Sequence, residues 1–125
     1  MSPIRVLVAD DHPVVLTALV DAVNGDPRFV VVATAASGGE ALQRAREVPA
    51  DIALLDVRMP GGGVGVTRAL LALPAPPVVV AISADPGSAV ARDMLAAGAK
   101  AFLVKGRIGG SLPDLLSDAS GKEAV

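Results

Sequence analysis

Three aspartates in this chain are placed where they could hold a metal ion and accept a chemical group. Asp10 and Asp11 are adjacent and follow the apolar run 4–9, while Asp56 follows a second apolar run, 52–55. If these runs are neighbouring strands of one parallel sheet, the three carboxylates meet at its carboxyl edge. Carboxylates so close repel one another, so either a cation lies among them or some stay protonated. The pattern therefore predicts a divalent metal site.

The segments that must position these carboxylates alternate between strand-like and helix-like patterns. The expected strands are residues 4–9, 29–35, 52–55, 78–82 and 101–104, and the expected helices are residues 13–23, 37–48, 66–73, 88–97 and 111–119. Five βα units in this order predict an α/β fold, in which helices cover both faces of a doubly wound parallel sheet. The functional site of such a sheet lies beyond the carboxyl ends of its strands.

Two further polar residues are expected at the same edge, because Ser83 follows the fourth strand and Lys105 follows the fifth. Each residue alone has a simpler explanation. A lysine at a strand end is usually solvated, a serine there is more often a turn residue, and an aspartate can cap the next helix. The convergence of three acids and a lysine on one edge favours a functional site over these separate explanations.

Composition excludes several other classes of function. The chain has 125 residues, 52% of them apolar, which is enough for one domain with a buried core. The absence of cysteine excludes disulfides, thiolate chemistry and Cys-ligated metal centres. A net charge of −2, a pI of about 5.2 and the lack of a basic stripe argue against nucleic-acid binding by this segment. The apolar runs are too short for a membrane span and no signal peptide is visible, so we expect a cytoplasmic location.

Four short motifs resemble, in order, the receiver domain of two-component response regulators. They are residues 8–13 (VADDHP), 55–60 (LDVRMP), 82–84 (ISA) and 102–105 (FLVK), each at the end of an expected strand. The resemblance covers residues 4–119 and implies a flavodoxin-like sheet of five strands in the order 2-1-3-4-5, with five helices. It also implies a receiver domain at residues 1–120, followed at 121–125 by a tail or the start of a linker to an output module.

The resemblance assigns catalytic roles at this edge of the sheet. Asp56 would accept a phosphoryl group, Lys105 would contact the phosphoryl oxygens as a point charge, and Ser83 would donate a hydrogen bond to one of them. Arg58 and Asp85, two residues after Asp56 and Ser83, would tune hydrolysis by steering or blocking water. The chain would thus catalyse its own phosphorylation and dephosphorylation only, and would not otherwise be an enzyme.

The cofactor that the resemblance implies is Mg²⁺. Asp11, Asp56 and the backbone carbonyl of Arg58 would bind it directly, and Asp10 would bind it through a water. Few protein ligands are needed, because Mg²⁺ keeps several waters. His12, the only histidine, is expected to be a surface or capping residue rather than a ligand.

The output that the resemblance implies is a conformational switch. Ser83 would move toward the phosphoryl group, and Phe102 would rotate inward, although a simple core role for Phe102 is a serious alternative. The face made by the fourth helix, fifth strand and fifth helix would then bind an output module, a partner protein or a second receiver as a homodimer. The phosphoryl donor would be a sensor histidine kinase or a phosphotransfer protein.

Two other classes of protein are alternatives to a phosphorylated receiver domain. A non-phosphorylated receiver-like interaction module usually lacks an acid or the lysine, and this chain lacks neither. A phosphatase with an aspartyl nucleophile usually has a second acid two residues after the nucleophile, which residues 10–13 (DDHP) do not provide. One departure from the receiver pattern concerns residues 61–65 (GGGVG), which carry no acid, and we expect this loop to be mobile.

Overall fold

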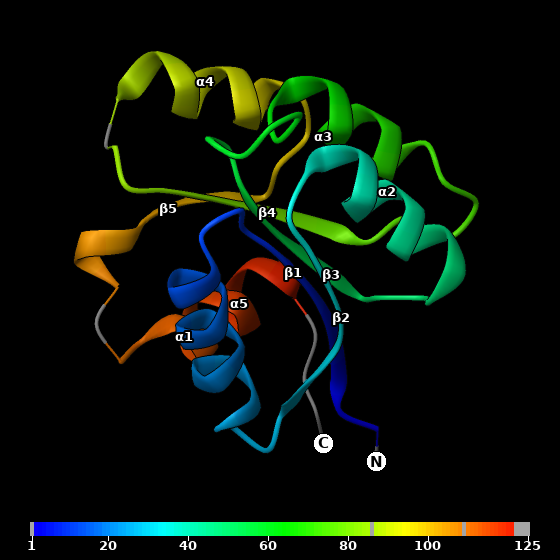
Figure 1. Cartoon of the computed structure of the whole chain (residues 1–125), viewed down its shortest axis with the longest axis vertical. Coiled ribbons are helices and arrows are strands. Elements are labelled where there is room, and N and C mark those ends of the chain that lie inside the picture. The colour runs from blue at the N-terminus through cyan, green and yellow to red at the C-terminus, as the bar shows by residue number, and fades with distance from the viewer. Residues whose placement is uncertain (1, 86, 109, 122–125) are drawn as a thin grey trace.

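Strands and helices alternate along the whole described part of the chain, which is residues 2–85, 87–108 and 110–121 of a computed structural model (Figure 1). Its strands are β1 (Ile4–Ala9), β2 (Phe29–Ala35), β3 (Ile52–Asp56), β4 (Val78–Ser83) and β5 (Ala101–Val104). Its α-helices are α1 (Pro13–Asn24), α2 (Gly38–Glu47), α3 (Val64–Leu71), α4 (Ser88–Ala96) and α5 (Leu112–Ser120), and the 3₁₀ turn η1 (Lys105–Arg107) follows β5. None of the helices within these ranges is long and apolar enough to cross a membrane.

The strands form one parallel sheet in the order β2-β1-β3-β4-β5. Helices α1 and α5 cover one face, and α2, α3 and α4 cover the other (Figure 1). The predicted fold class, strand order and number of helices are therefore confirmed. The strand order reverses beside β1, so β1 and β3 flank the position where such sheets place their functional site.

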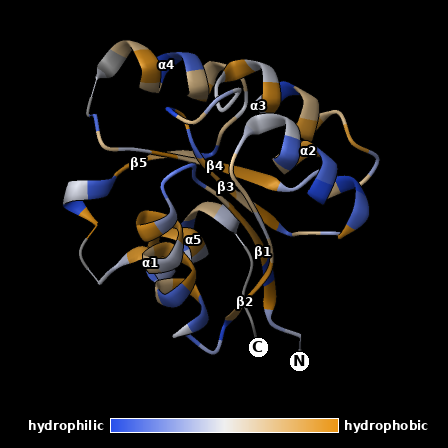
Figure 2. Ribbon diagram, viewed as in Figure 1, coloured by the Kyte–Doolittle hydropathy of each residue, from blue (hydrophilic) through white to orange (hydrophobic). Residues whose placement is uncertain are grey.

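The central strands are buried because helices lie on both of their faces. Every residue of β3 is buried, which explains its continuous apolar run ending in an acid. Successive residues of β1 enter opposite cores: Val6 and Val8 pack toward α1 and α5, whereas Leu7 and Ala9 pack toward α2, α3 and α4. Figure 2 shows the resulting band of apolar strands between the two helical layers. This packing holds the ends of β1 and β3 rigidly side by side.

Several element boundaries differ from those predicted. Helix α3 begins at Val64 and ends at Leu71, two residues earlier than expected, with Gly63 at its N-cap. Strands β3 and β4 extend to include Asp56 and Ser83. Helix α4 is followed by Gly98, which has a φ of 115°, a backbone conformation that favours glycine. The predicted tail begins at Gly121, the last described residue, and residues 122–125 lie outside the described part.

The glycine-rich loop after β3, expected to be mobile, is packed closely against the start of α2. The Gly38 N–H donates to the Pro60 carbonyl over 2.7 Å. A Cβ on Gly38 would lie 1.8 Å from the Gly61 carbonyl oxygen, and one on Gly62 would lie 2.3 Å from the Asp56 carbonyl oxygen. Two backbone segments therefore approach here more closely than any side chain would permit. This contact fixes the loop that follows Asp56.

Candidate functional site

The three aspartates meet at the carboxyl edge of the sheet, as their spacing predicted. Asp10 directly follows β1 and Asp56 ends β3, and these two strands are paired. One carboxylate oxygen from each of Asp10, Asp11 and Asp56 and one ring nitrogen of His12 all lie within 4.8 Å of one another. Asp10 and Asp56 are buried, whereas Asp11 and His12 are exposed. The inner part of the cluster is therefore shielded from solvent, and its outer part is accessible.

Lys105 supplies the positive charge at this edge. Its Nζ lies 2.7 Å from Asp10 Oδ2 and 3.5 Å from Asp56 Oδ2, and its side chain is 19% exposed. The turn η1 begins at Lys105, immediately after β5, so the lysine reaches the cluster from the far side of β4. One ammonium is therefore shared between two buried carboxylates, with Asp11 adding a third negative charge nearby.

Asp56 carries a buried side-chain oxygen that lacks a hydrogen-bond donor among the described residues. Its Oδ1 accepts a hydrogen bond from the Arg58 N–H at 3.1 Å. Its Oδ2 is buried and accepts no hydrogen bond within the described part of the chain, although the Lys105 ammonium lies nearby. Burial raises the pKa of Asp56, and the negative charge of Asp10 acts in the same direction. The free oxygen thus has unused lone pairs facing the cluster.

Asp10 is buried beside Asp56, but its charge is well compensated. Its Oδ1 accepts the His12 N–H at 2.9 Å, and its Oδ2 accepts a hydrogen bond from Lys105 Nζ. Burial alone would raise the pKa of Asp10, but the bonds from Lys105 and His12 outweigh it, so the pKa is lowered. Two adjacent carboxyl groups therefore have pKa values displaced in opposite directions, which is typical of functional sites.

The residues present fit a hard divalent cation. Three carboxylates against one ammonium leave a surplus of negative charge, and Asp56 Oδ2 lacks a hydrogen-bond donor in the described residues. A divalent ion that prefers oxygen ligands would neutralise the surplus negative charge and would also give Asp56 Oδ2 a partner. Asp10, Asp11 and Asp56 are the carboxylates that could hold it.

Ser83 lies at the end of β4, next to the strand that carries Asp56. It is 1% exposed, and its Oγ accepts a hydrogen bond from the Asp85 N–H at 3.1 Å. The Arg58 guanidinium forms an ion pair with the Asp85 carboxylate, which links the loop after β3 to the loop after β4. Sequence reasoning assigned Arg58 and Asp85 the same role but did not predict that they touch. Their ion pair is exposed at the rim of the site.

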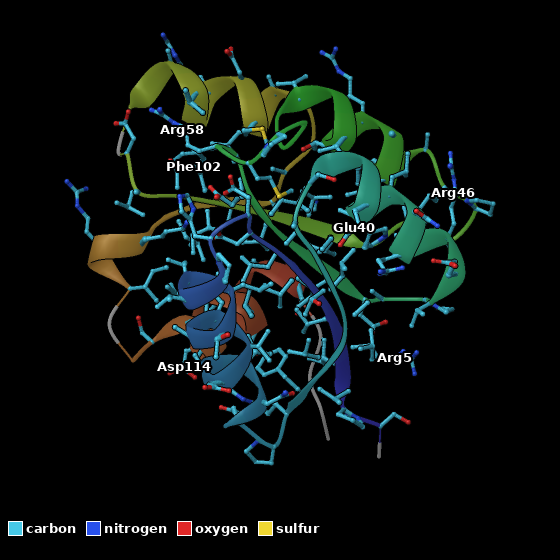
Figure 3. All side chains as sticks on the ribbon, viewed as in Figure 1. Arg5, Glu40, Arg46, Arg58, Phe102 and Asp114 are labelled. Atoms are coloured by element: carbon cyan, nitrogen blue, oxygen red, sulfur yellow. The ribbon has the colours of Figure 1, made fainter. Side chains whose placement is uncertain are left out.

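Phe102 occupies the middle of β5 and is partly buried. It pairs with Ala81 on β4 and packs against the core beneath α2, α3 and α4. Figure 3 shows Arg58 and Phe102 on the side of the molecule that α4 covers. The packing supports a core role in this state, and a switching role stays a prediction.

His12 is exposed, as expected, and its ring lies beside the acidic cluster. It occupies the N-cap position of α1, but its side chain makes no capping hydrogen bond. Instead its Nδ1 lies 3.1 Å from Asp11 Oδ1 and 3.3 Å from Asp10 Oδ1. The signal in the sequence was its position directly after the two acids, since a ring so close in the chain is held near them.

Comparisons with known proteins agree with this geometry. Residues 6–114 match the family model described as the response regulator receiver domain. The chain is 40% identical over 104 residues to the response regulator GacA of Pseudomonas viridiflava, covering 82% of this chain and 49% of that protein. The chain spans about half the length of the GacA relatives that it matches.

Solved structures agree as well. The receiver domain of the putative response regulator NarL from Mycobacterium tuberculosis superposes with a TM-score of 0.91 at 32% identity, covering 98% of this chain and 100% of that one. The CheX–CheY–BeF₃–Mg²⁺ complex of Borrelia burgdorferi contains a chain that matches with a TM-score of 0.75 at 30% identity, covering 82% of this chain and 78% of that one. Both structures are similar to this chain over most of its length.

Proposed function

Because the chain belongs to the response regulator receiver domain family, we propose that Asp56 is the residue that accepts the phosphoryl group. Phosphorylation of an aspartate is the general function of this family. The observation that carries the assignment is the buried Asp56 Oδ2, which accepts no hydrogen bond from the described residues and lies 3.5 Å from the Lys105 ammonium. Nothing observed favours the alternative, a receiver-like module that works without phosphorylation.

The reaction transfers a phosphoryl group to a carboxylate. A new bond forms between an Asp56 oxygen and phosphorus while the bond between phosphorus and the donor's imidazole nitrogen breaks, and the electron pair of that bond returns to the imidazole. The Asp56 carboxylate has lone pairs available for phosphorus and for a cation, because its Oδ2 accepts no hydrogen bond from the described residues. The Arg58 N–H holds the other oxygen and so orients the carboxylate.

Positive charge must offset the charge on the three equatorial oxygens of the transferring group. Lys105 already contacts both buried carboxylates and would contact those oxygens. Receiver domains typically bind Mg²⁺ through an acidic cluster, and here Asp11, Asp56, the Arg58 carbonyl and, through a water, Asp10 would hold it. When bound, Mg²⁺ supplies further positive charge to the transferring group. The match to a chain of a complex that contains BeF₃ and Mg²⁺ supports this cofactor.

The phosphorylated carboxylate would then act as a switch. Ser83 would turn its hydroxyl to a phosphoryl oxygen, and Phe102 would follow into the space released. This movement would remodel the surface made by α4, β5 and α5, on which an output module, a partner protein or a second copy of the chain would bind. Phosphorylation can only bias an equilibrium that already exists between two conformations.

The remaining assignments follow from the same proposal. The donor is a sensor histidine kinase or a phosphotransfer protein. A cytoplasmic location stays a prediction from the sequence. Beyond catalysing its own phosphorylation and dephosphorylation, this segment has no enzymatic role. The exposed Arg58–Asp85 ion pair would regulate the access of water to the phosphorylated Asp56.

Incubation with Mg²⁺ and acetyl phosphate, followed by intact-mass measurement, tests this function. The wild-type chain should gain one phosphate, and Asp56→Asn should gain none. Asp118→Asn, which changes an exposed acid on α5, is the matched control and should be labelled like the wild type. Undiminished labelling of Asp56→Asn would contradict the assignment.

A further inference from the structure

The imidazole of His12 lies against the acidic cluster rather than on the helix that it precedes. It makes no capping hydrogen bond, and its Nδ1 is 3.1 Å from Asp11 Oδ1 and 3.3 Å from Asp10 Oδ1. Pro13 restricts the backbone of His12 to an extended conformation, and the His12 N–H is bound to Asp10 Oδ1 at 2.9 Å. The ring is therefore attached to a backbone that is already fixed beside the cluster.

The His12 ring is hydrogen-bonded to Asp10 Oδ1 over 3.3 Å, and the spacing of these atoms also suits ligands around one ion. In an octahedral site with bonds of about 2.1 Å, adjacent ligand atoms lie about 3.0 Å apart. The His12 nitrogen meets that spacing to within a few tenths of an ångström from both acids. All four candidate ligand atoms, including the one from Asp56, fall within 4.8 Å of one another. A small movement of exposed side chains would bring them around a common centre.

A second observation points to a ligand at the same place. Asp56 is 1% exposed, and its Oδ2 has the Lys105 ammonium 3.5 Å away but accepts no hydrogen bond in the described part of the chain. A buried carboxylate oxygen without a donor is costly, and a bound cation removes that cost. The cluster thus combines a buried unsatisfied oxygen with an accessible nitrogen, since the His12 side chain is 65% exposed.

We propose that His12 is a further direct side-chain ligand beside Asp11 and Asp56, which gives this site enhanced affinity for divalent first-row transition metals of the Mn²⁺ to Zn²⁺ class. The inference rests on the metal site of the proposed function and adds a ligand to it. An imidazole nitrogen binds these metals well, whereas Mg²⁺ prefers oxygen ligands. His12 therefore selects the metal, while the carboxylates provide the charge that any divalent ion needs.

The informative measurement is how much the loss of His12 changes the affinity for Ni²⁺ compared with the affinity for Mg²⁺. Carboxylate sites already bind Ni²⁺ more tightly than Mg²⁺, so a preference for Ni²⁺ by itself proves nothing. His12 is the only histidine and the chain has no cysteine, so an untagged protein offers no other imidazole or thiolate. Calorimetry with Ni²⁺ and with Mg²⁺, on the wild type and on His12→Gln, isolates the contribution of this ring.

His12→Gln should weaken Ni²⁺ binding by about tenfold or more and should change Mg²⁺ binding by less than about twofold. Equal Ni²⁺ affinity in the two proteins would overturn the inference. An equal loss of both metals would also overturn it, because that result indicates a structural effect. Pulsed EPR of bound Mn²⁺ gives an independent signature: nitrogen coupling from the ring is expected in the wild type, and its absence would contradict direct ligation.

Asp11→Asn separates this inference from the proposed function. It should weaken both Mg²⁺ and Ni²⁺, because it removes a ligand that both metals use. If Asp11→Asn binds Mg²⁺ like the wild type, the proposed magnesium site is wrong, and the inference that rests on it is wrong as well. If Asp11→Asn weakens both metals but His12→Gln binds Ni²⁺ like the wild type, the magnesium site stands and His12 is not a ligand.

Discussion

Removing the charge of Asp56 should stabilise the metal-free protein. Asp56→Asn keeps the size of the side chain and the acceptor for the Arg58 N–H, but it eliminates a buried negative charge next to Asp10. Lys105 keeps its shorter contact, the one to Asp10 Oδ2 at 2.7 Å. The substitution therefore removes a repulsion without leaving the ammonium unpaired.

The size of the effect follows from one buried oxygen without a hydrogen-bond donor in the described residues, because the Asn amide that replaces it can donate to the neighbouring carboxylates. Such a group costs roughly 1–3 kcal/mol, so Asp56→Asn should raise the free energy of unfolding by about that amount. For a domain of this length, each kcal/mol corresponds to roughly 4 °C in Tm. Mg²⁺ should narrow this difference in stability, because at about ten times its Kd it stabilises the wild type by roughly 1.4 kcal/mol, whereas the variant has lost one of the ligands that bind the ion.

The pH dependence has a defined sign. Since burial raises the pKa of Asp56 above its ordinary value of 3.8, the folded state keeps this proton at pH values where the unfolded chain has lost it. The stability gained from that proton is fully present below pH 3.8 and is lost as the pH rises through the raised pKa. Asp10, whose pKa is lowered, contributes in the opposite sense: its stabilisation is lost as the pH falls from 3.8 through its lowered pKa.

Urea denaturation in EDTA, across a pH series and then with added Mg²⁺, measures these effects. The wild type should lose stability with rising pH just above 3.8, relative to Asp56→Asn, which lacks the titrating group. Asp118→Asn should stay within about 0.5 kcal/mol of the wild type, as exposed substitutions usually do. A metal-free Asp56→Asn that is less stable than the wild type at neutral pH would refute the reasoning.

Three other substitutions test separate parts of the structure. Lys105→Met leaves the buried carboxylates without their ammonium and should lower the free energy of unfolding by about 3 kcal/mol in urea titrations; a loss smaller than about 1 kcal/mol would show that the ammonium is not needed. Gly38→Ala should be strongly destabilising because its Cβ would meet backbone at 1.8 Å, whereas Gly39→Ala on the same helix meets nothing within 4 Å and should be neutral or stabilising; equal effects would contradict the close contact. Arg58→Ala and Asp85→Ala should alter the hydrolysis rate of the phosphorylated chain non-additively, with a coupling of about 0.5 kcal/mol, and strict additivity would show that the ion pair has no role.

The alternation of strands and helices and the clustering of acids could be predicted because they depend on features that are local in sequence, whereas the strand order came from the resemblance to a known family. An apolar run that ends in an acid specifies a buried strand and the edge at which its polar residue appears. In a parallel sheet, all such ends lie at one edge, so Asp10, Asp56 and Lys105 could be placed together without coordinates. Phosphoryl transfer required the resemblance to a known family in addition, since clustered acids alone indicate only a cation.

The details that could not be predicted depend on loop conformation and side-chain direction. The close contact between Gly38 and Gly61 joins two loops whose relative path no periodicity describes. The Arg58–Asp85 ion pair likewise spans two loops. His12 lies on the surface at the N-cap position of α1, as expected, but the contact of its ring with Asp11 could not be predicted because it depends on side-chain direction. Helix α3 begins at Val64 and not at the expected Val66, since Gly65, which was expected in the loop, is part of the helix.

The most direct test of the central claim locates the phosphoryl group on the chain. After reaction with acetyl phosphate and Mg²⁺, borohydride reduction converts an aspartyl phosphate to homoserine, and peptide mass spectrometry then identifies its position. The account predicts homoserine at position 56 alone and none when Mg²⁺ is removed with EDTA. Homoserine at position 10 or 11, with Asp56 unmodified, would contradict it.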